Sequence, residues 1–176
     1  MSRLESGLER LRLWDHALCI RFNGAVRIAS VRWAFRLVSR LGDGIFWYTL
    51  MLFLLVAGGA QAFVPVARMA MTGLVCTLVY KWLKSKTSRP RPFAVVNAVR
   101  AGADPLDAFS FPSGHTLHAV AFSVVAIAFY PGLAWLLVPF TILVALSRVV
   151  LGLHYPSDVL AGAALGALIA GCFLGF

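Results

Sequence analysis

The sequence predicts an all-α integral-membrane helical bundle with about five transmembrane helices and an N-terminal amphipathic helical segment. The 176 residues are 60% hydrophobic and only 13% charged, and the mean hydropathy is +0.83, which is far more apolar than soluble domains are. Long uncharged runs recur along the chain, and proline and glycine separate them. The length suits one domain, so we expect residues 1–43 to form the amphipathic interfacial segment and residues 44–176 the membrane domain.

The N-terminal segment is rich in arginine and is not expected to cross the bilayer. Residues 2–40 contain eight arginines among Leu, Ile, Val, Trp and Phe. One arginine at the centre of a membrane helix costs about 3 kcal/mol even on a lenient scale. The arginines at 21, 27, 32, 36 and 40 alternate with apolar residues roughly as on a helix that lies along the headgroups. A helix packed against the other spans is the alternative.

Two membrane spans are predicted at residues 44–63 and 64–84. The run from Gly44 to Phe63 is uncharged for 20 residues, and a span needs about 20 residues at 1.5 Å each. In the second span, Arg68 and Lys81 would have to extend toward the membrane surfaces.

A polar, proline-rich loop is expected at residues 84–111, because the run from Arg89 to Pro92 cannot continue a helix. The part that contains Asp104 and Asp107 is expected to act as a lid or a headgroup reader. Three further spans follow at residues 112–129, 133–150 and 156–176. Five crossings bring the end of the second span, the start of the third, the end of the fourth and the start of the fifth to one membrane face.

The composition also excludes several classes. The three cysteines are scattered singly, which argues against a disulfide framework or a zinc site. No carboxylates or Cys/His residues are spaced to hold a divalent ion, so no cofactor or metal is expected. The net charge of +9 does not indicate nucleic acid, because the basic residues are not interleaved with polar surface. No removable signal peptide is expected either.

The start of the third span has the features of an anion site. Pro112 at a first helical position would leave the following backbone N–H groups unpaired and able to bind an anion. Gly114 would let the anion approach the backbone, and Ser113 would add a hydroxyl donor. Taken alone, the run also fits an ordinary helix start flanked by His115.

A second cluster lies between the fourth and fifth spans. Arg148, at the end of an apolar span, is a functional candidate because a buried arginine is costly. Asp158 follows His154 by four residues and would reach back to its ring. A carboxylate bound to one ring nitrogen fixes the tautomer of His154 and leaves the other nitrogen as a nucleophile. With His115 nearby, one histidine would attack and the other would protonate the leaving oxygen. Lys84 and Arg91 would add two cations for a phosphate.

These residues resemble, in order and spacing, the three-part signature of the type 2 phosphatidic acid phosphatase family, which includes vanadium haloperoxidases and bacterial acid phosphatases. The signature runs Lys84, six residues, Arg91-Pro92; then Pro112-Ser113-Gly114-His115; then Ser147-Arg148, five residues, His154, three residues, Asp158. Arg89 does not fit this spacing. It is therefore expected, with Lys81 and Lys86, to be an ordinary basic flank.

The resemblance implies roles for eight residues and no metal. His154 would be the nucleophile, His115 the general acid and Asp158 the partner that orients His154. The phosphate would be bound by Lys84, Arg91, Ser113, Gly114 and Arg148.

The function so implied is that of a metal-independent lipid phosphate phosphatase. It would hydrolyse a phosphomonoester or diphosphate of a membrane lipid, such as undecaprenyl pyrophosphate, phosphatidylglycerophosphate, phosphatidic acid or lipid A, through a phosphohistidine. The expected partners are this lipid and the bilayer, and the oligomeric state is left open. The alternatives are a lipid-to-lipid phosphotransferase, a haloperoxidase and a non-enzymatic lipid carrier or channel.

The expected location is a bacterial-type inner membrane, with the active site on either side. Fifteen of the sixteen Lys and Arg residues fall on the catalytic face, which favours the cytoplasm. The family resemblance favours the periplasmic side. Membrane members of the family commonly have six spans, and here the arginine-rich segment replaces the first.

Overall fold

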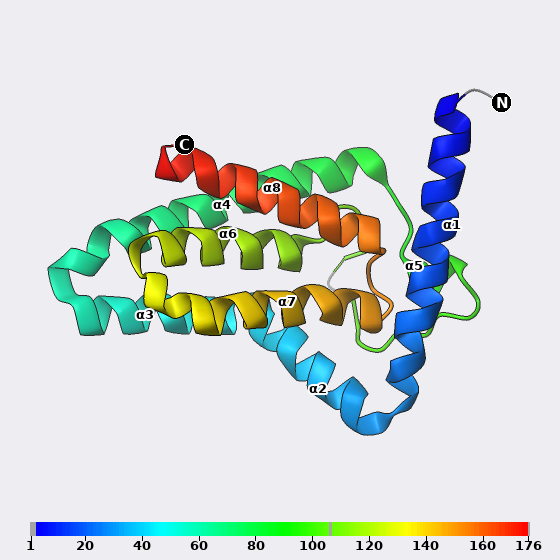
Figure 1. Cartoon of the computed structure of the whole chain (residues 1–176), viewed down its shortest axis with the longest axis horizontal. Helices are drawn as coiled ribbons and strands as arrows, with labels where there is room; N and C mark the ends of the chain where they lie inside the picture. The colour runs from blue at the N-terminus through cyan, green and yellow to red at the C-terminus, as the bar shows by residue number, and fades with distance from the viewer. Residues whose placement is uncertain (1–2, 106, 176) are drawn as a thin grey trace.

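The computed structural model describes residues 3–105 and 107–175, and their regular structure is helical throughout (Figure 1). The α-helices are α1 (Arg3–Asn23), α2 (Ala29–Arg40), α3 (Phe46–Gly58), α4 (Phe63–Thr87), α5 (Pro92–Val95), α6 (Gly114–Phe129), α7 (Ala134–Val150) and α8 (Pro156–Leu174). Short turns of other helix types are η1 (Gly24–Arg27), η2 (Leu41–Ile45), η3 (Gly59–Ala62) and η4 (Pro131–Leu133). Phe176, the predicted end of the last span, lies outside the described residues.

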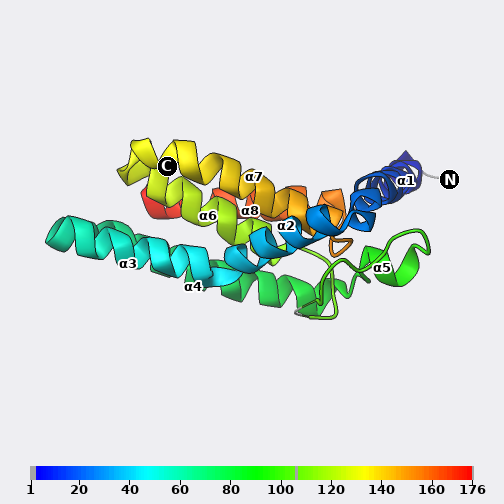
Figure 2. The same cartoon turned by 90° about the horizontal axis from the view of Figure 1, so that it is seen from below.

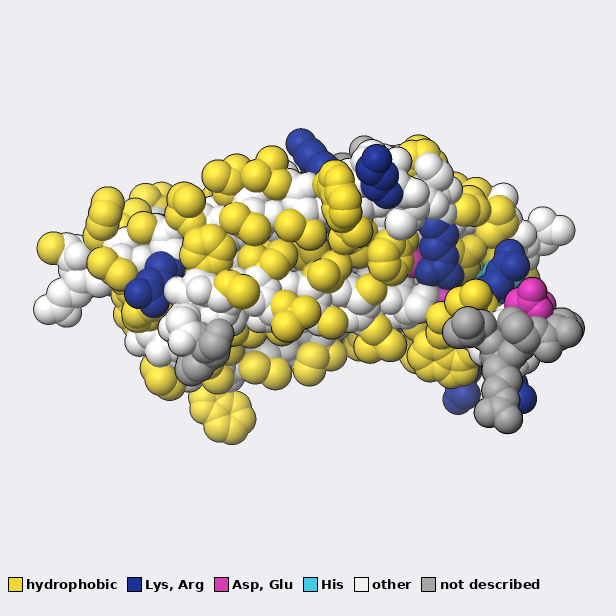
Figure 3. All heavy atoms as spheres, turned by 90° about the horizontal axis from the view of Figure 1, so that it is seen from above, with side chains coloured by type: hydrophobic (Ala, Val, Ile, Leu, Met, Phe, Trp, Pro, Cys, Tyr) yellow, Lys and Arg dark blue, Asp and Glu magenta, His cyan; other side chains and the backbone are white. Residues whose placement is uncertain are grey.

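Three stretches of the described chain are long and apolar enough to cross a membrane. They are Ala29–Val95, Pro131–Val150 and Pro156–Leu174, and α6 is a shorter apolar helix of 16 residues. On the face shown in Figure 3, hydrophobic side chains cover the middle of the bundle, and most of the visible Lys and Arg side chains lie toward one end. The predicted all-α membrane bundle is therefore confirmed, whereas the number of five crossings stays a prediction.

The first predicted span ends earlier than expected. The α-helix α3 covers only 13 residues and ends where Gly59 takes a φ of 54°. Glycine adopts this left-handed conformation without steric cost, so the chain turns through η3 and returns as α4. The prediction of one continuous helix over residues 44–63 is therefore wrong.

The central helix of the bundle is α6, which packs against α4, α7 and α8 (Figures 1 and 2). Its approach to α8 depends on two glycines four residues apart. A Cβ atom at Gly162 would lie 2.6 Å from the backbone oxygen of Ser113, and one at Gly166 would clash with the oxygen of Leu117. Small residues at this spacing let helix backbones come into contact in membranes.

The starts of α6 and α8 are consequently held together. The backbone N–H of Ser113 donates to the carbonyl oxygen of Asp158 at 3.1 Å. The ends of α4 and α7 lie at the same end of the bundle (Figure 1). The topology thus places the predicted catalytic segments at one level.

The N-terminal segment forms two helices instead of one. Helix α1 crosses the loop-bearing end of the bundle and packs on α7 and α8, and α2 then runs along α7 (Figure 1). Arg36 and Arg40 on α2 are exposed, whereas Ser39 between them is buried. The segment therefore packs on the bundle, which was the alternative to a separate surface helix. Its position along the headgroups stays a prediction.

Candidate active site

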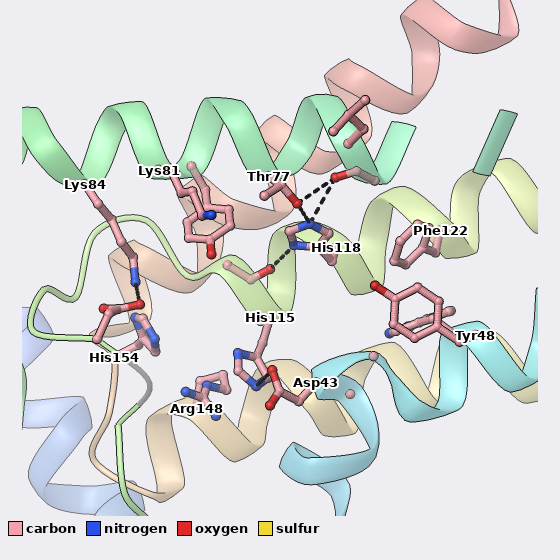
Figure 4. A pocket seen from close by; sticks show the side chains of 18 of the residues that line it. Asp43, Tyr48, Thr77, Lys81, Lys84, His115, His118, Phe122, Arg148 and His154 are labelled. Atoms are coloured by element: carbon pink, nitrogen blue, oxygen red, sulfur yellow. Dashed lines mark hydrogen bonds and ion pairs between the residues drawn. The ribbon is translucent and has the colours of Figure 1, made fainter. Parts of the chain in front are cut away.

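A cavity of about 810 Å³ opens at the loop-bearing end of the bundle (Figure 4). Six of the eight predicted site residues line it, namely Lys84, Arg91, Gly114, His115, Arg148 and His154. The rest of the wall is largely apolar and includes Trp47, Met51, Leu74, Tyr80 and Phe122. The cavity therefore has two parts. One is cationic and contains histidine, and the other is apolar.

His154 is buried, and its surroundings define the tautomer. Nδ1 lies 2.6 Å from the carbonyl oxygen of Ser110, and Nε2 lies 3.3 Å from Nη1 of Arg91. A carbonyl oxygen can only accept, so Nδ1 carries the proton and Nε2 keeps its lone pair. Burial lowers the pKa of His154 well below its ordinary value, and nearby cations lower it further. The ring is consequently neutral, with a free nitrogen that faces the cations.

Asp158 was predicted to hold the ring of His154. Its Oδ2 lies 3.8 Å from Nδ1 of His154 and accepts the backbone N–H of Tyr155 at 2.9 Å. The carbonyl oxygen of Ser110 occupies the hydrogen-bonding position instead. Asp158 therefore acts on the ring through its charge and through the start of α8. Ser110 is a partner that sequence reasoning missed, because a backbone carbonyl leaves no signal in side-chain spacing.

Arg89 is not the ordinary basic flank that was expected. It donates to Asp158, to the hydroxyl of Ser157 at 2.9 Å and to Oδ2 of Asp15 at 2.8 Å. The guanidinium also lies 4.0 Å from the ring centre of Tyr155. Asp15 and Asp158 are both fully buried, so Arg89 pairs with two carboxylates that water cannot reach. An acidic residue within an otherwise apolar part of α1 was the available signal. Lys86 is exposed, as expected of a flank, whereas Lys81 is exposed but also lines the cavity.

Asp107 occupies the space between the two cations of the first motif. Its carboxylate forms ion pairs with Lys84 and, at 2.9 Å, with Nη2 of Arg91. The backbone oxygen of Asp107 also accepts from Nε of Arg91 at 3.0 Å. Burial alone would raise the pKa of Asp107, but Lys84 and Arg91 outweigh burial and lower it. An anionic group thus already lies where the phosphate was predicted to bind.

The guanidinium of Arg148 has a hydrogen-bond donor without an acceptor in the described part of the chain. The residue is 3% exposed, and Nη1 donates to the hydroxyl of Ser39 on α2. Within the described part of the chain, no group accepts a hydrogen bond from Nε. A buried donor without a partner costs about 1–3 kcal/mol, so this position favours an anionic ligand.

The start of α6 differs from the predicted arrangement. Ser113 is the N-cap, and its hydroxyl accepts from the backbone N–H of Thr116 at 3.5 Å. Pro112 precedes this cap, so the prediction that Pro112 is the first helical residue is wrong. The Ser113 side chain is fully buried and does not line the cavity, whereas Gly114 does. A phosphate contact from Ser113 stays a prediction.

His115 and His118 lie on successive turns of α6 but have different surroundings (Figure 4). Nε2 of His115 lies 3.5 Å from Oδ1 of Asp43. Both ring nitrogens of His118 are engaged instead, by Thr77 Oγ1 at 3.0 Å and by the carbonyl oxygen of Gly114 at 2.8 Å. His115 is therefore the better placed of the two to exchange a proton with a ligand in the cavity.

The fold and the site together define a membrane protein whose helical bundle carries a cationic, histidine-containing cavity at one end. Comparison with known proteins identifies its family. The chain belongs to the PAP2 superfamily, which it matches over residues 50–176. The family predicted from the motif spacing is confirmed.

Several relatives are similar in sequence. Undecaprenyl-diphosphatase BcrC of Bacillus subtilis is 32% identical over 119 residues, which cover 68% of this chain and 58% of the relative. Phosphatidylglycerophosphatase B of Bacillus subtilis is 35% identical over 46% of this chain and 47% of its own length. The chain thus spans about half the length of the curated relatives it matches.

Two solved structures share the fold over almost the whole chain. Aquifex aeolicus LpxE has a TM-score of 0.77 and 26% identity, and the match covers 96% of this chain and 94% of LpxE. A transmembrane PAP2 phosphatidylglycerolphosphate phosphatase from Bacillus subtilis has a TM-score of 0.75 and 24% identity over 95% of this chain and 86% of its own. The likeness to the second structure supports the fold alone.

Proposed function

We propose that this protein is a lipid phosphate phosphatase that works through a phosphohistidine on His154. The observation that carries the proposal is the orientation of His154. Its protonated Nδ1 is bound to a carbonyl oxygen, and its Nε2 lone pair faces Arg91 inside a cavity with an apolar extension. A neutral, oriented imidazole beside several cations suits attack on a phosphate.

The reaction takes two steps. Nε2 of His154 attacks phosphorus, an N–P bond forms, and the bond to the leaving oxygen breaks while His115 donates a proton to that oxygen. Water then attacks phosphorus and gives a proton to His115, the N–P bond to His154 breaks, and phosphate leaves. Lys84, Arg91 and Arg148 stabilise the negative charge on the phosphoryl oxygens, as phosphoryl transfer requires.

The apolar part of the cavity accepts the lipid. Its wall contains Trp47, Met51, Leu74 and Phe122, which present no charge to an acyl or prenyl chain. We assign membrane crossings to α3, α4, α6, α7 and α8 in a bacterial-type inner membrane, with α1 and α2 at the surface. The catalytic cluster then lies at headgroup depth, where a lipid phosphate is found.

The relatives suggest which lipids to test. Their names refer to undecaprenyl diphosphate, phosphatidylglycerophosphate and lipid A, which are all phosphates on long apolar anchors. Purified protein in detergent should release phosphate from at least one of these lipids or from phosphatidic acid. Product analysis with an added acceptor lipid would reveal a phosphotransferase, and release from no lipid would contradict the proposal.

The same phosphate-release assay tests whether the reaction needs a metal. The described ranges contain no group of three or more His, Cys, Asp or Glu residues that could hold a metal ion. We expect EDTA to leave turnover unchanged and vanadate to inhibit, because vanadate can adopt the five-coordinate geometry of phosphoryl transfer. Loss of activity in EDTA that magnesium restores would mean that the mechanism is wrong.

A further inference from the structure

Asp43 lies outside the family match and outside every motif discussed above, yet its carboxylate reaches the active site. It belongs to η2, the junction between α2 and α3, where Gly44 takes a φ of 119°. Only glycine adopts such a conformation readily. Its neighbour Gly42 packs so closely on α7 that a Cβ atom there would lie 2.9 Å from Val144 Cγ2. The junction is therefore held in place against the bundle.

The side chain of Asp43 points from this junction toward His115 (Figure 4). Oδ1 lies 3.5 Å from Nε2 of the imidazole, which is within ion-pair distance. Asp43 and His115 line the substrate cavity together, and both also line a second cavity of about 460 Å³ beneath α2. The pair thus forms part of the wall between two cavities.

The other charged groups around His115 are mainly positive or can become positive. They are Arg148 of α7, His154 in the loop after α7, His118 of α6 and Lys84 of α4. Those around Asp43 are Arg148, Arg40 of α2 and His118. Cations near an imidazole oppose its protonation, whereas a carboxylate within about 4–6 Å favours it. Asp43 is the carboxylate at ion-pair distance from the His115 ring.

We infer that Asp43 is a positioning residue that orients His115 as the general acid and favours its protonated form. The inference rests on the proposed function, because it assigns a partner to the acid of that reaction. A general acid must hold a proton at the working pH and release it to the leaving oxygen. Asp43 places a negative charge beside a ring that the cations of the phosphate site otherwise surround. The His115–Asp43 pair therefore complements the His154–Asp158 pair across the cavity.

The test is the pH profile of Asp43→Asn on two substrates, phosphatidic acid and p-nitrophenyl phosphate, with the full chain in detergent. The alkoxide of a lipid alcohol needs a proton to leave, whereas p-nitrophenolate needs little. We expect the basic limb of kcat/KM on phosphatidic acid to move by about 1–3 pH units toward lower pH. Activity on that substrate should recover as the pH falls, and the profile on p-nitrophenyl phosphate should change little.

Two further variants make the outcome decisive. Asp43→Glu keeps the charge and should restore much of the basic limb, and Glu9→Gln removes one exposed carboxylate from α1 and should leave the profile unchanged. A wild-type basic limb in Asp43→Asn would overturn the inference. An equal loss on both substrates at every pH would overturn it too, since a purely structural role behaves in that way. A wild-type protein that releases no phosphate would instead overturn the proposed function.

Discussion

The two histidines of the cavity should fail in different ways when each is replaced. His154→Ala removes the nucleophile, so acid quench with radiolabelled substrate should find no phosphoprotein. His115→Ala removes the proton donor and should slow turnover of a lipid phosphate by about 10²–10⁴. It should recover part of its activity on p-nitrophenyl phosphate, because that leaving group needs little protonation.

A milder defect is expected for Asp158→Asn. The ring of His154 would keep its hydrogen bond to Ser110 but lose the charge of the nearby carboxylate. Acid-labile, base-stable label that persists in His154→Ala would contradict the assignment. The nucleophile would then be His115 or His118.

Asp107 should compete with the phosphate for Lys84 and Arg91, since its carboxylate already pairs with both. We expect Asp107→Asn to lower the vanadate concentration for half-inhibition by about tenfold, which corresponds to about 1.4 kcal/mol. Asp104→Asn, which changes an exposed carboxylate of the same loop, should have a smaller effect. Equal inhibition of the wild type and Asp107→Asn would show that the carboxylate does not compete.

The competition between the Asp107 carboxylate and the phosphate should depend on pH in a defined way. Lys84 and Arg91 outweigh the effect of burial and lower the pKa of Asp107, so the carboxylate stays charged through the neutral range. The difference between Asp107→Asn and the wild type should therefore persist from about pH 8 down to about pH 5. It should fade only when the pH falls below the ordinary carboxyl range and Asp107 becomes protonated.

At the scale of the elements, an ionic cluster with two buried carboxylates helps to attach α1 to α8. Arg89 pairs with Asp15 of α1 and with Asp158 of α8, and both carboxylates are fully buried. Removing one partner of a buried pair costs about 3–5 kcal/mol, because the other charge remains unpaired. Arg89→Ala should therefore lower the Tm in detergent by several degrees.

Lys86→Ala is the matched control for this prediction, since Lys86 is an exposed cation of the same region. Its Tm should equal that of the wild type. Asp15→Asn should destabilise the protein less than Arg89→Ala, because Arg89 would still pair with Asp158. If all three variants unfold at the wild-type temperature, the cluster does not attach α1 to the bundle.

At the scale of the whole molecule, the charges predict the orientation in the membrane. Fifteen of the sixteen Lys and Arg residues precede α3 or lie at the catalytic end, and Arg68 is at the opposite end. The positive-inside rule then places the catalytic end in the cytoplasm. With five crossings, a reporter that works only in the periplasm should be active when fused after Phe176.

A silent periplasmic reporter, together with an active cytoplasmic one at the same position, would support the opposite orientation. Several of the cations are engaged at the phosphate site and carry less weight in the rule. The eight N-terminal arginines are the main reason for the cytoplasmic expectation.

Local features of the sequence were enough to predict the class, the family and the residues that gather around the cavity. The length of an apolar run predicts a membrane helix, and the spacing of the three motifs, which predicts the family, can be counted directly in the sequence. The same features misplaced the break at Gly59 and the start of α6, because a run of apolar letters does not show where the backbone turns.

Only the tertiary structure revealed the partners of those residues. Asp43 meets His115, Asp107 meets Lys84, and Ser110 binds His154, although each pair is distant in sequence. Such pairs depend on how α6 packs against its neighbours and where the loops fold back, which no local pattern specifies. The sequence predicts an ordinary basic flank at Arg89 for the same reason, since its two carboxylates come from helices at opposite ends of the chain.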